Sequence, residues 1–191
     1  MASVFQLHVE RWQECTACPL HETRQKVVLA RGSVPCDVLF VGEAPGESED
    51  CLGAPFVGPA GQLLDQIVAR ALRAAASQAV LRLAFTNLVC CIPRDANGDK
   101  ATKPEHDDVL SCQPRLEEFV YDVAKPKLVV TVGKEAQDYL DQGYRHSLKL
   151  PAGTKQAHIT HPAAILRMNE AQKGLEAQRC RITLANALGE L

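Results

Sequence analysis

Eight cysteines give this 191-residue chain an unusual supply of metal-binding chemistry. Cys15 and Cys18 form a C-x2-C pair, and Cys91 and Cys112 follow much later in the chain. Thiolates held close together repel one another unless a cation neutralises them, and four of them suit either Zn²⁺ or an iron–sulfur cluster. The spacing does not decide between these two. We predict a metal site on these four cysteines, which ties the N-terminal segment to the rest of the protein.

The third ligand has a rival. Cys90 precedes Cys91, and neighbouring side chains on an extended segment point in opposite directions, so only one of the two can face the site. Cys36, Cys51, Cys90 and Cys180 are interpreted as free thiols, with Cys90 as the alternative to Cys91. The N-terminus has no apolar signal-peptide core, so we expect a cytoplasmic protein. A disulfide framework is not expected there, because that compartment keeps thiols reduced.

A second group of chemically useful residues follows an apolar run, Val38–Val41, which has the composition of a buried parallel strand. The turn Gly42–Gly46 comes next, then a glycine-rich loop that carries Phe56, and a helix that opens near Gln62. Ligands of open α/β sheets bind at the carboxyl ends of strands. We therefore predict the pocket of the protein in this turn and loop.

Two further polar residues end predicted strands. Asn87 lies in the last part of the run Leu83–Leu88, and His161 follows the short run Ala157–Thr160. Both therefore fall at carboxyl ends of strands, where such sheets bind their ligands.

The elements that must position these residues alternate along the chain. A further strand is expected over Lys127–Val132, and Gly143–Gly153 is expected to be an irregular loop. Helices are predicted from Gln62, from Pro104 to about Tyr121, from Gly133 to about Leu140, and from Asn169 to Leu188. This alternation predicts an α/β fold with a mostly parallel sheet and helices on both faces.

Composition narrows the class of protein. A hydrophobic fraction of 46% supports a real core, and we find neither an internal repeat nor a domain boundary. We expect one domain, residues 1–191, with the cysteine pair 15–18 packed onto it. A net charge of −2 argues against binding nucleic acid through bulk charge alone, although local basic patches stay possible. The turn Gly42–Gly46 fits neither the P-loop nor the G-x-G-x-x-G spacing, which excludes those phosphate sites.

With these residues in view, the chain resembles the family 4 uracil-DNA glycosylases, the iron–sulfur branch of the uracil-DNA glycosylase superfamily. Four blocks carry the resemblance, in the order of the family, and the second is the most specific. They are Cys15–Leu20 (CTACPL), Gly42–Asp65 (GEAPG through GQLLD), Thr86–Val89 (TNLV) with Cys91, and His161–Arg167 (HPAAILR).

The resemblance implies a fold, a cofactor and an activity. The expected fold is a four-stranded parallel β-sheet flanked by α-helices. The expected cofactor is a 4Fe-4S cluster on Cys15, Cys18, Cys91 and Cys112. The expected activity is that of a monofunctional glycosylase in base excision repair: it flips uracil out of DNA and hydrolyses the N-glycosidic bond, leaving an abasic site. Uracil-containing DNA, single- or double-stranded, is the expected partner, and a monomer is expected.

The resemblance also assigns the base pocket. Phe56 would stack on the flipped pyrimidine, beside Gly42 and Ala44. Asn87 offers one acceptor and two donors, which can pair with the O4 and N3–H edge of uracil. Cytosine shows the opposite pattern there, so an amide held in one orientation rejects it.

Catalysis and DNA opening involve other residues of the same blocks. His161 would donate to uracil O2 as negative charge develops on the leaving base. Glu43 and Glu49 are the nearest carboxylates, and either could orient water or stabilise the sugar cation, since Ala44 can activate nothing. The sequence does not choose between them. A DNA wedge is expected in Ala164, Ile165, Leu166 and Arg167, because apolar side chains next to a cation suit the gap left by a flipped base.

Two alternatives stay open at this point. The same fold could act on another deaminated or modified base. The chain could also be a non-catalytic, metal-stabilised DNA-binding module, for which Ala44 is the argument; the joint presence of Glu43, Phe56, Asn87 and His161 argues against it.

Overall fold

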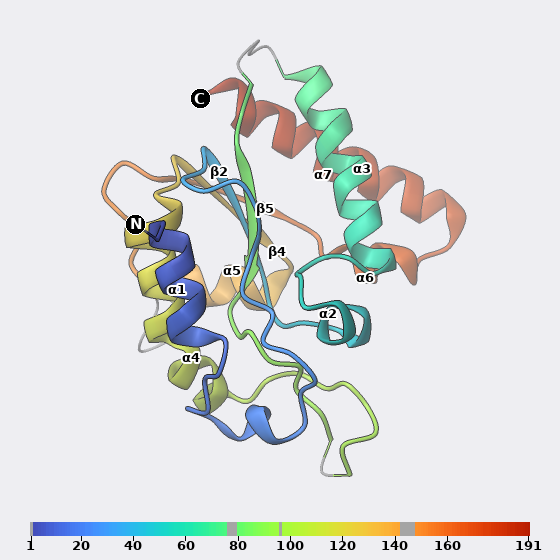
Figure 1. Ribbon diagram of the computed structural model, residues 1–191. Coiled ribbons are helices and arrows are strands. Elements are labelled where there is room, and N and C mark those ends of the chain that lie inside the picture. The colour runs from blue at the N-terminus through green and yellow to red at the C-terminus, as the bar shows by residue number, and fades with distance from the viewer. Residues whose placement is uncertain (1, 76–79, 96, 142–147) are drawn as a thin grey trace.

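The computed structural model describes residues 2–75, 80–95, 97–141 and 148–191. A central β-sheet separates two layers of helices (Figure 1). Its strands have the order β1-β3-β2-β4-β5, where β2, β3, β4 and β5 are parallel to one another. These strands are β1 (Arg31–Gly32), β2 (Val38–Gly42), β3 (Leu83–Asn87), β4 (Leu128–Val132) and β5 (Lys155–Ile159).

Seven α-helices are present in the described residues, in chain order between and after the strands. They are α1 (Val4–Trp12), α2 (Glu47–Leu52), α3 (Pro59–Ala74), α4 (His106–Glu118), α5 (Lys134–Leu140), α6 (Pro162–Leu166) and α7 (Glu170–Gly189). A 3-10 turn, η1 (Pro19–Glu22), follows the first cysteine pair, and a π-helical turn, η2 (Phe119–Ala124), continues α4. None of these helices is long and apolar enough to cross a membrane.

The alternation of side chains along the strands builds two cores. Val38 and Phe40 of β2 face one side, where α3 and α7 pack side by side (Figure 1). Leu39 and Val41 face the other side, which α4, η2 and α5 cover. Both faces of β2 are buried, as expected for a strand in the middle of a mostly parallel sheet.

The expectation of a four-stranded parallel sheet is wrong in one respect: the sheet is mixed and has five strands. The additional strand, β1, pairs antiparallel with the edge of β3 through Arg31↔Phe85 and Gly32↔Ala84. Two residues are too few to produce a period-two pattern, so the sequence carried no signal for this strand. The four expected strands are all present, and the ends of each lie within two residues of the prediction.

Two helices, α2 and α6, lie where no helix was predicted, and two further helical segments differ from expectation. The sequence analysis assigned no helix to the N-terminus, yet α1 forms there, with Ser3 as its N-cap and Gln6 completing a capping box. The helix predicted from Pro104 to about Tyr121 begins at His106 and changes to the π-helical turn at Phe119. Of the predicted loop Gly143–Gly153, residues 143–147 lie outside the described residues, and the rest contains no helix or strand.

Candidate functional site

The predicted pocket lies where β2 and β3 end side by side. Gly42 and Asn87 are the last residues of these strands and are paired in register. The two segments that follow these strands remain hydrogen-bonded, because Leu88 N–H donates to the Gly42 carbonyl (2.9 Å) and Val89 N–H donates to the Glu43 carbonyl (3.1 Å). The second and third of the four blocks, which carry Gly42 and Asn87, are thus fixed to one another by backbone hydrogen bonds.

Gly42 lies directly against two predicted base-contacting side chains. A Cβ at this position would be 2.4 Å from Asn87 Oδ1 and 2.6 Å from Phe56 Cζ. No side chain fits there without displacing one of them, which explains a glycine at the end of β2. The structure therefore brings Asn87 and Phe56 together over the Gly42 backbone, and both are buried.

Phe56 has a backbone conformation that few residues with side chains adopt, at φ +56°. Such left-handed residues are held by their surroundings and cluster at functional sites. The first turn of α3 packs directly against the Phe56 backbone, since a Cβ on Gly61 would lie 1.9 Å from the Phe56 carbonyl oxygen. The Phe56 ring lies 6.4 Å from the His161 ring, centroid to centroid.

Glu49 holds the loop on which Phe56 lies. Its Oε1 accepts hydrogen bonds from the N–H groups of Val57 (2.9 Å) and Gly58 (2.8 Å), and its Oε2 accepts one from Gly46 N–H (3.2 Å). A carboxylate with three backbone donors is already occupied in this structure. The sequence left two roles to Glu43 and Glu49, orienting water and stabilising the sugar cation. The contacts of Glu49 are instead those of a residue that holds the Phe56 loop in place.

His161 follows β5 and forms the N-cap of α6. Its Nδ1 accepts a hydrogen bond from Ala163 N–H at 3.1 Å. Burial lowers the pKa of His161, and Arg167 adds to this, while Glu135 and Glu49 oppose it. The ring is therefore neutral near neutral pH, and with Nδ1 as acceptor its proton is on Nε2, free to be donated to a ligand.

Glu43 lies at the wall of a cavity of about 230 Å³, which Leu88 and Glu135 also line. Burial raises the pKa of Glu43, and the carboxylate of Glu135 adds to this, whereas Lys103 opposes it. Glu135 forms an ion pair with Lys103. Neither Glu135 nor Lys103 was predicted as part of the site. Glu135 lies in the first turn of α5 and Lys103 in a polar loop, and nothing in the sequence shows that these segments approach the end of β2.

The predicted wedge residues are divided between the core and the surface. Ile165 is 1% exposed and packs with the α3–α7 core, whereas Leu166 is 41% exposed. Arg167 is exposed and donates its Nε to the Ala163 carbonyl oxygen (3.0 Å). Ala164 is half-buried. Leu166 and Arg167 are therefore the members of this group that a DNA strand could contact.

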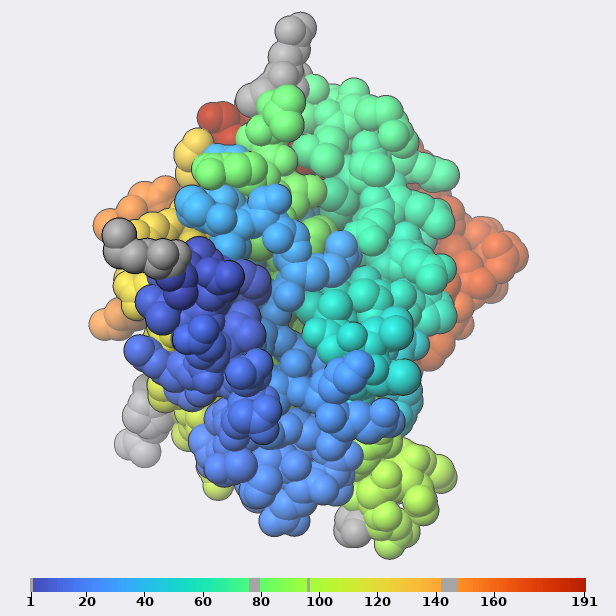
Figure 2. All heavy atoms as spheres, viewed as in Figure 1, coloured from blue at the N-terminus to red at the C-terminus, as the bar shows by residue number. Residues whose placement is uncertain are grey.

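The predicted cysteine site joins three segments of the chain. Figure 2 shows the N-terminal segment (dark blue), which carries Cys15 and Cys18, spread over one face of the molecule; Cys91 lies in the loop that follows β3. Arg24 connects these two segments, since its Nη1 donates to the Cys15 carbonyl (2.5 Å) and to Cys91 Sγ (3.2 Å). Cys112 comes from α4, the third segment.

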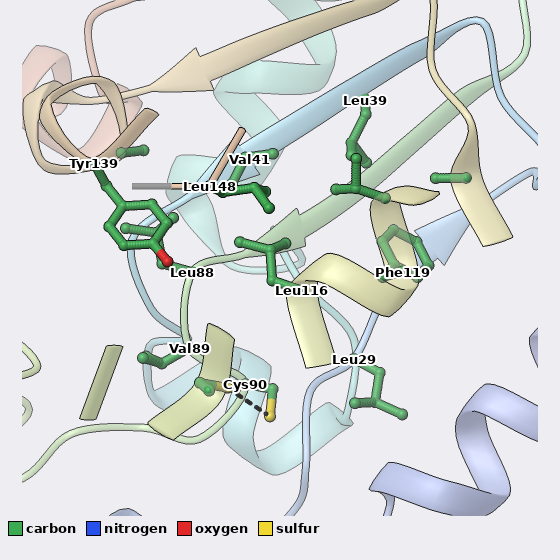
Figure 3. Packing of buried hydrophobic residues seen from close by; sticks show 14 of the residues in the cluster. Leu29, Leu39, Val41, Leu88, Val89, Cys90, Leu116, Phe119, Tyr139 and Leu148 are labelled. Atoms are coloured by element: carbon green, nitrogen blue, oxygen red, sulfur yellow. Dashed lines mark hydrogen bonds between the residues drawn. The ribbon is translucent and has the colours of Figure 1, made fainter. Parts of the chain in front are cut away.

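The thiols themselves lie near one another. Cys90 Sγ and Cys112 Sγ are 3.6 Å apart, which the dashed line at Cys90 marks in Figure 3. Burial raises the pKa of Cys18, and the nearby Cys112 and Cys15 add to this. The hydrogen bond with Cys90 lowers the pKa of Cys91, as does Arg24. Both Cys90 and Cys91 are buried, so burial does not decide between them as ligand.

This donor set fits a group held by thiolates, although no ready-made ion site is present. Within the described ranges, no three His, Cys, Asp or Glu side chains are arranged to hold a metal ion. The chemistry nevertheless agrees with the expected cluster: five thiols gather in one region, and two arginines, Arg24 and Arg115, contact them. One nitrogen of buried Arg115, Nε, has no hydrogen-bond partner. Such cations require anionic partners, which metal-bound thiolates supply.

Comparison with known proteins gives one consistent result. The family model of the uracil DNA glycosylase superfamily matches residues 30–185. The chain is 38% identical over 126 residues to a type-4 uracil-DNA glycosylase of Sulfurisphaera tokodaii, which covers 66% of this chain and 53% of that protein. It is 35% identical over 128 residues to the type-4 uracil-DNA glycosylase of Saccharolobus solfataricus, covering 67% and 55%. With the type-4 uracil-DNA glycosylase of Thermotoga maritima it shares 31% identity over 168 residues, 83% of this chain and 81% of that protein. The match thus spans about half the length of the first two relatives and most of the third.

Proposed function

Because the chain belongs to the uracil DNA glycosylase superfamily, and within it to the type-4 uracil-DNA glycosylases, we propose that it excises uracil from DNA. The reaction is hydrolysis of the N-glycosidic bond by a monofunctional glycosylase, which leaves an abasic site for base excision repair. The observation that carries the proposal is the meeting of Asn87, Phe56 and His161 at the carboxyl ends of β2, β3 and β5.

Recognition of the base follows from the pocket geometry. A base enclosed in the duplex cannot reach these side chains, so the nucleotide is flipped out. Phe56 stacks on the flipped ring, and the Asn87 amide pairs with its O4 and N3–H edge. Gly42 supports this arrangement, since its missing side chain lets Asn87 and Phe56 approach one another, and the half-buried Ala44 follows in the same turn.

Bond cleavage leaves negative charge on uracil and positive charge on the sugar. The neutral His161 ring carries its proton on Nε2, and we assign this N–H to uracil O2, where it stabilises the developing anion. Glu43 is our choice for the carboxylate that orients water, because its oxygens are not committed to the loop as those of Glu49 are. Glu49 supports catalysis by holding the Phe56 loop.

Binding of DNA involves the exposed end of α6. Leu166 enters the gap left by the flipped base, and Arg167 contacts the neighbouring phosphates. The exposure of both side chains, next to His161 in sequence, supports this role.

The cofactor that fits the cysteine site is a 4Fe-4S cluster, held by Cys15, Cys18, Cys91 and Cys112. When bound, the cluster neutralises the thiolates and joins the N-terminal segment to the loop after β3 and to α4. We choose Cys91 over Cys90 as ligand, because Arg24 lies on its sulfur and its lowered pKa favours the thiolate.

The proposal is tested by incubating protein purified without oxygen with a labelled oligonucleotide that contains one uracil. Alkaline treatment cleaves the strand at an abasic site. Strand cleavage that depends on both uracil and protein is the expected result. The same assay with hypoxanthine or xanthine in place of uracil tests the alternative of another base. Intact DNA in all of these assays, with an iron-containing protein that still binds DNA, would favour the binding module.

A further inference from the structure

Arg115 of α4 is among the largest fully buried side chains, at 1% exposure. None of the carboxylate ion pairs in the described residues includes it. A buried guanidinium needs an anion nearby. The groups available to this one are the cysteines of the predicted cluster site.

The same guanidinium holds the backbone that carries the base-reading asparagine. Its Nη2 donates to the carbonyl oxygens of Asn87 (2.8 Å) and Leu88 (2.7 Å), and also approaches Cys112 Sγ (3.6 Å). Its Nη1 donates to Thr86 Oγ1 (3.0 Å), and the Thr86 hydroxyl donates to the Leu29 carbonyl (2.7 Å). Arg115 therefore contacts three consecutive residues at the end of β3.

Arg115 supplies hydrogen bonds to the end of β3 on the side where no neighbouring strand in the described part of the chain pairs with it. β1 pairs with β3 only at Ala84 and Phe85, so it gives no support to the end of β3. On the side of β2, the Leu88 and Val89 N–H groups donate to the Gly42 and Glu43 carbonyls. Arg115 satisfies the carbonyls of the same segment. Figure 3 shows Leu88, Val89 and Cys90 passing beside Leu116, the α4 residue next to Arg115.

We propose that Arg115 is a positioning residue that couples the cysteine site to the uracil pocket. Its guanidinium lies 3.6 Å from Cys112 Sγ, while its rigid fork of donors fixes the backbone of Asn87 and Leu88. The orientation of the Asn87 amide, and with it the preference for uracil over cytosine, then depends on a residue that touches no substrate. This inference rests on the proposed function, because it concerns the same pocket.

The substitution Arg115→Lys separates the two parts of this role. Lysine keeps the positive charge beside the thiols, but one ammonium group cannot reproduce the planar fork that reaches Thr86, Asn87 and Leu88. We expect the variant to keep its iron content and iron–sulfur absorption spectrum. We expect inhibition by free uracil to weaken about tenfold to a hundredfold, because small displacements of a binding group have effects of that size. The uracil-to-cytosine preference should fall with it.

The matched control is Arg82→Lys. Arg82 is tied to Asp37 just before β3, at the opposite end of the same strand. This variant should keep the iron content, the uracil inhibition and the excision rate of the unmodified protein. Excision by the unmodified protein tests the proposed function separately, so failure of the present inference is distinguishable from failure of that function.

Two results would overturn the inference. One is an Arg115→Lys protein with full iron content and unchanged inhibition by uracil. The other concerns the double variant: in an Asn87→Ala background we expect Arg115→Lys to weaken uracil inhibition no further, since there is no amide left to position. A further weakening by the same factor as in the single variant would overturn the inference. If Arg115→Lys fails to fold, Thr86→Val replaces it, because that change removes the acceptor of Nη1 and leaves the charge in place. Iron retained with uracil inhibition several-fold weaker supports the proposal, and unchanged inhibition contradicts it.

Discussion

The base pocket and the cysteine site share one short segment, Asn87–Cys91, yet they are held in different ways. In the pocket the backbone is fixed by ordinary hydrogen bonds, such as the three that Glu49 accepts from loop N–H groups. In the cysteine site the contacts between thiols are long, 3.6 Å between Cys90 and Cys112, and Cys15 and Cys18 are only half-buried. Backbone hydrogen bonds organise the pocket, whereas in the cysteine site the proposed cluster would join segments that Arg24 and Arg115 now connect.

The largest effect is expected from Cys18→Ser, which tests the cysteine side of this comparison. Loss of one thiolate should release the cluster, and since metal binding contributes to folding the protein should also lose solubility. Iron analysis and the yield of soluble protein measure both. Cys51→Ser, at an exposed thiol on α2, is the control and should retain iron. A Cys18→Ser protein that keeps both iron and stability would disprove the ligand assignment.

His161→Ala tests the pocket side. Removing one donor from a developing anion typically lowers kcat by about 10²–10³-fold, or about 2.7–4 kcal/mol. Iron content should not change, because the His161 side chain contacts Ala163 and Phe56 and none of the thiols. Single-turnover excision assays measure the effect. The control, His158→Ala on β5, should keep the wild-type rate, and an equal rate for His161→Ala would remove the role assigned to it.

Gly42→Ala tests whether the pocket tolerates one added carbon. The new Cβ would overlap Asn87 Oδ1 and Phe56 Cζ, so we expect an excision rate lower by about tenfold or more. The iron–sulfur spectrum should stay the same. Gly174→Ala is the matched control, since nothing lies within 4 Å of the added atom and alanine is favoured in a helix. Wild-type kinetics in Gly42→Ala would show that Asn87 and Phe56 need not meet there.

The pH dependence of excision reports the ionisation of Glu43. Burial raises the pKa of this carboxyl group, so it stays protonated to a higher pH than an exposed glutamate does. If the ionised form orients water, kcat falls as pH decreases through this raised pKa. The variant Glu43→Gln should be slow and should lack this acidic limb. Lys103→Met should move the limb to higher pH, because Lys103 lowers the pKa of Glu43. If kcat of Glu43→Gln still falls at low pH as in the unmodified protein, the fall is due to the ionisation of another group.

The smallest effect is expected from Leu166→Ala. A shortened wedge should lower excision from duplex DNA by about tenfold at most, because alanine removes only part of the apolar contact that offsets the cost of unstacking. Excision from single-stranded DNA should stay unchanged, since no partner strand has to be replaced. The control is Leu175→Ala, because Leu175 is also exposed but lies on α7. Equal losses on both substrates would argue that Leu166 supports the fold and not the opening of DNA.

Most of the architecture could be read from the sequence. Three of the four parallel strands, β2, β3 and β4, follow from apolar runs. The pocket follows from the polar residues and glycines placed directly after strands, because ligands of such sheets bind there. The two-residue β1 gave no usable signal, whereas the start of α1 is marked in the sequence by the capping box of Ser3 and Gln6, which was overlooked. The π-helical turn that replaces the end of the predicted helix 104–121 also depends on packing, where Phe119 contacts Phe5 and His8 of α1.

The sequence by itself determined which side chains follow the end of each strand. It was enough to predict Asn87, Phe56 and His161 as pocket residues. Only the tertiary structure decided which of them meet. It placed Ile165 in the core and Leu166 outside, committed Glu49 to the loop, and brought Arg115 from α4 to the backbone of Asn87. The physical reason is that spacing along a strand or helix reports local geometry, whereas the partner of a buried charge is set by contacts between segments far apart in the chain.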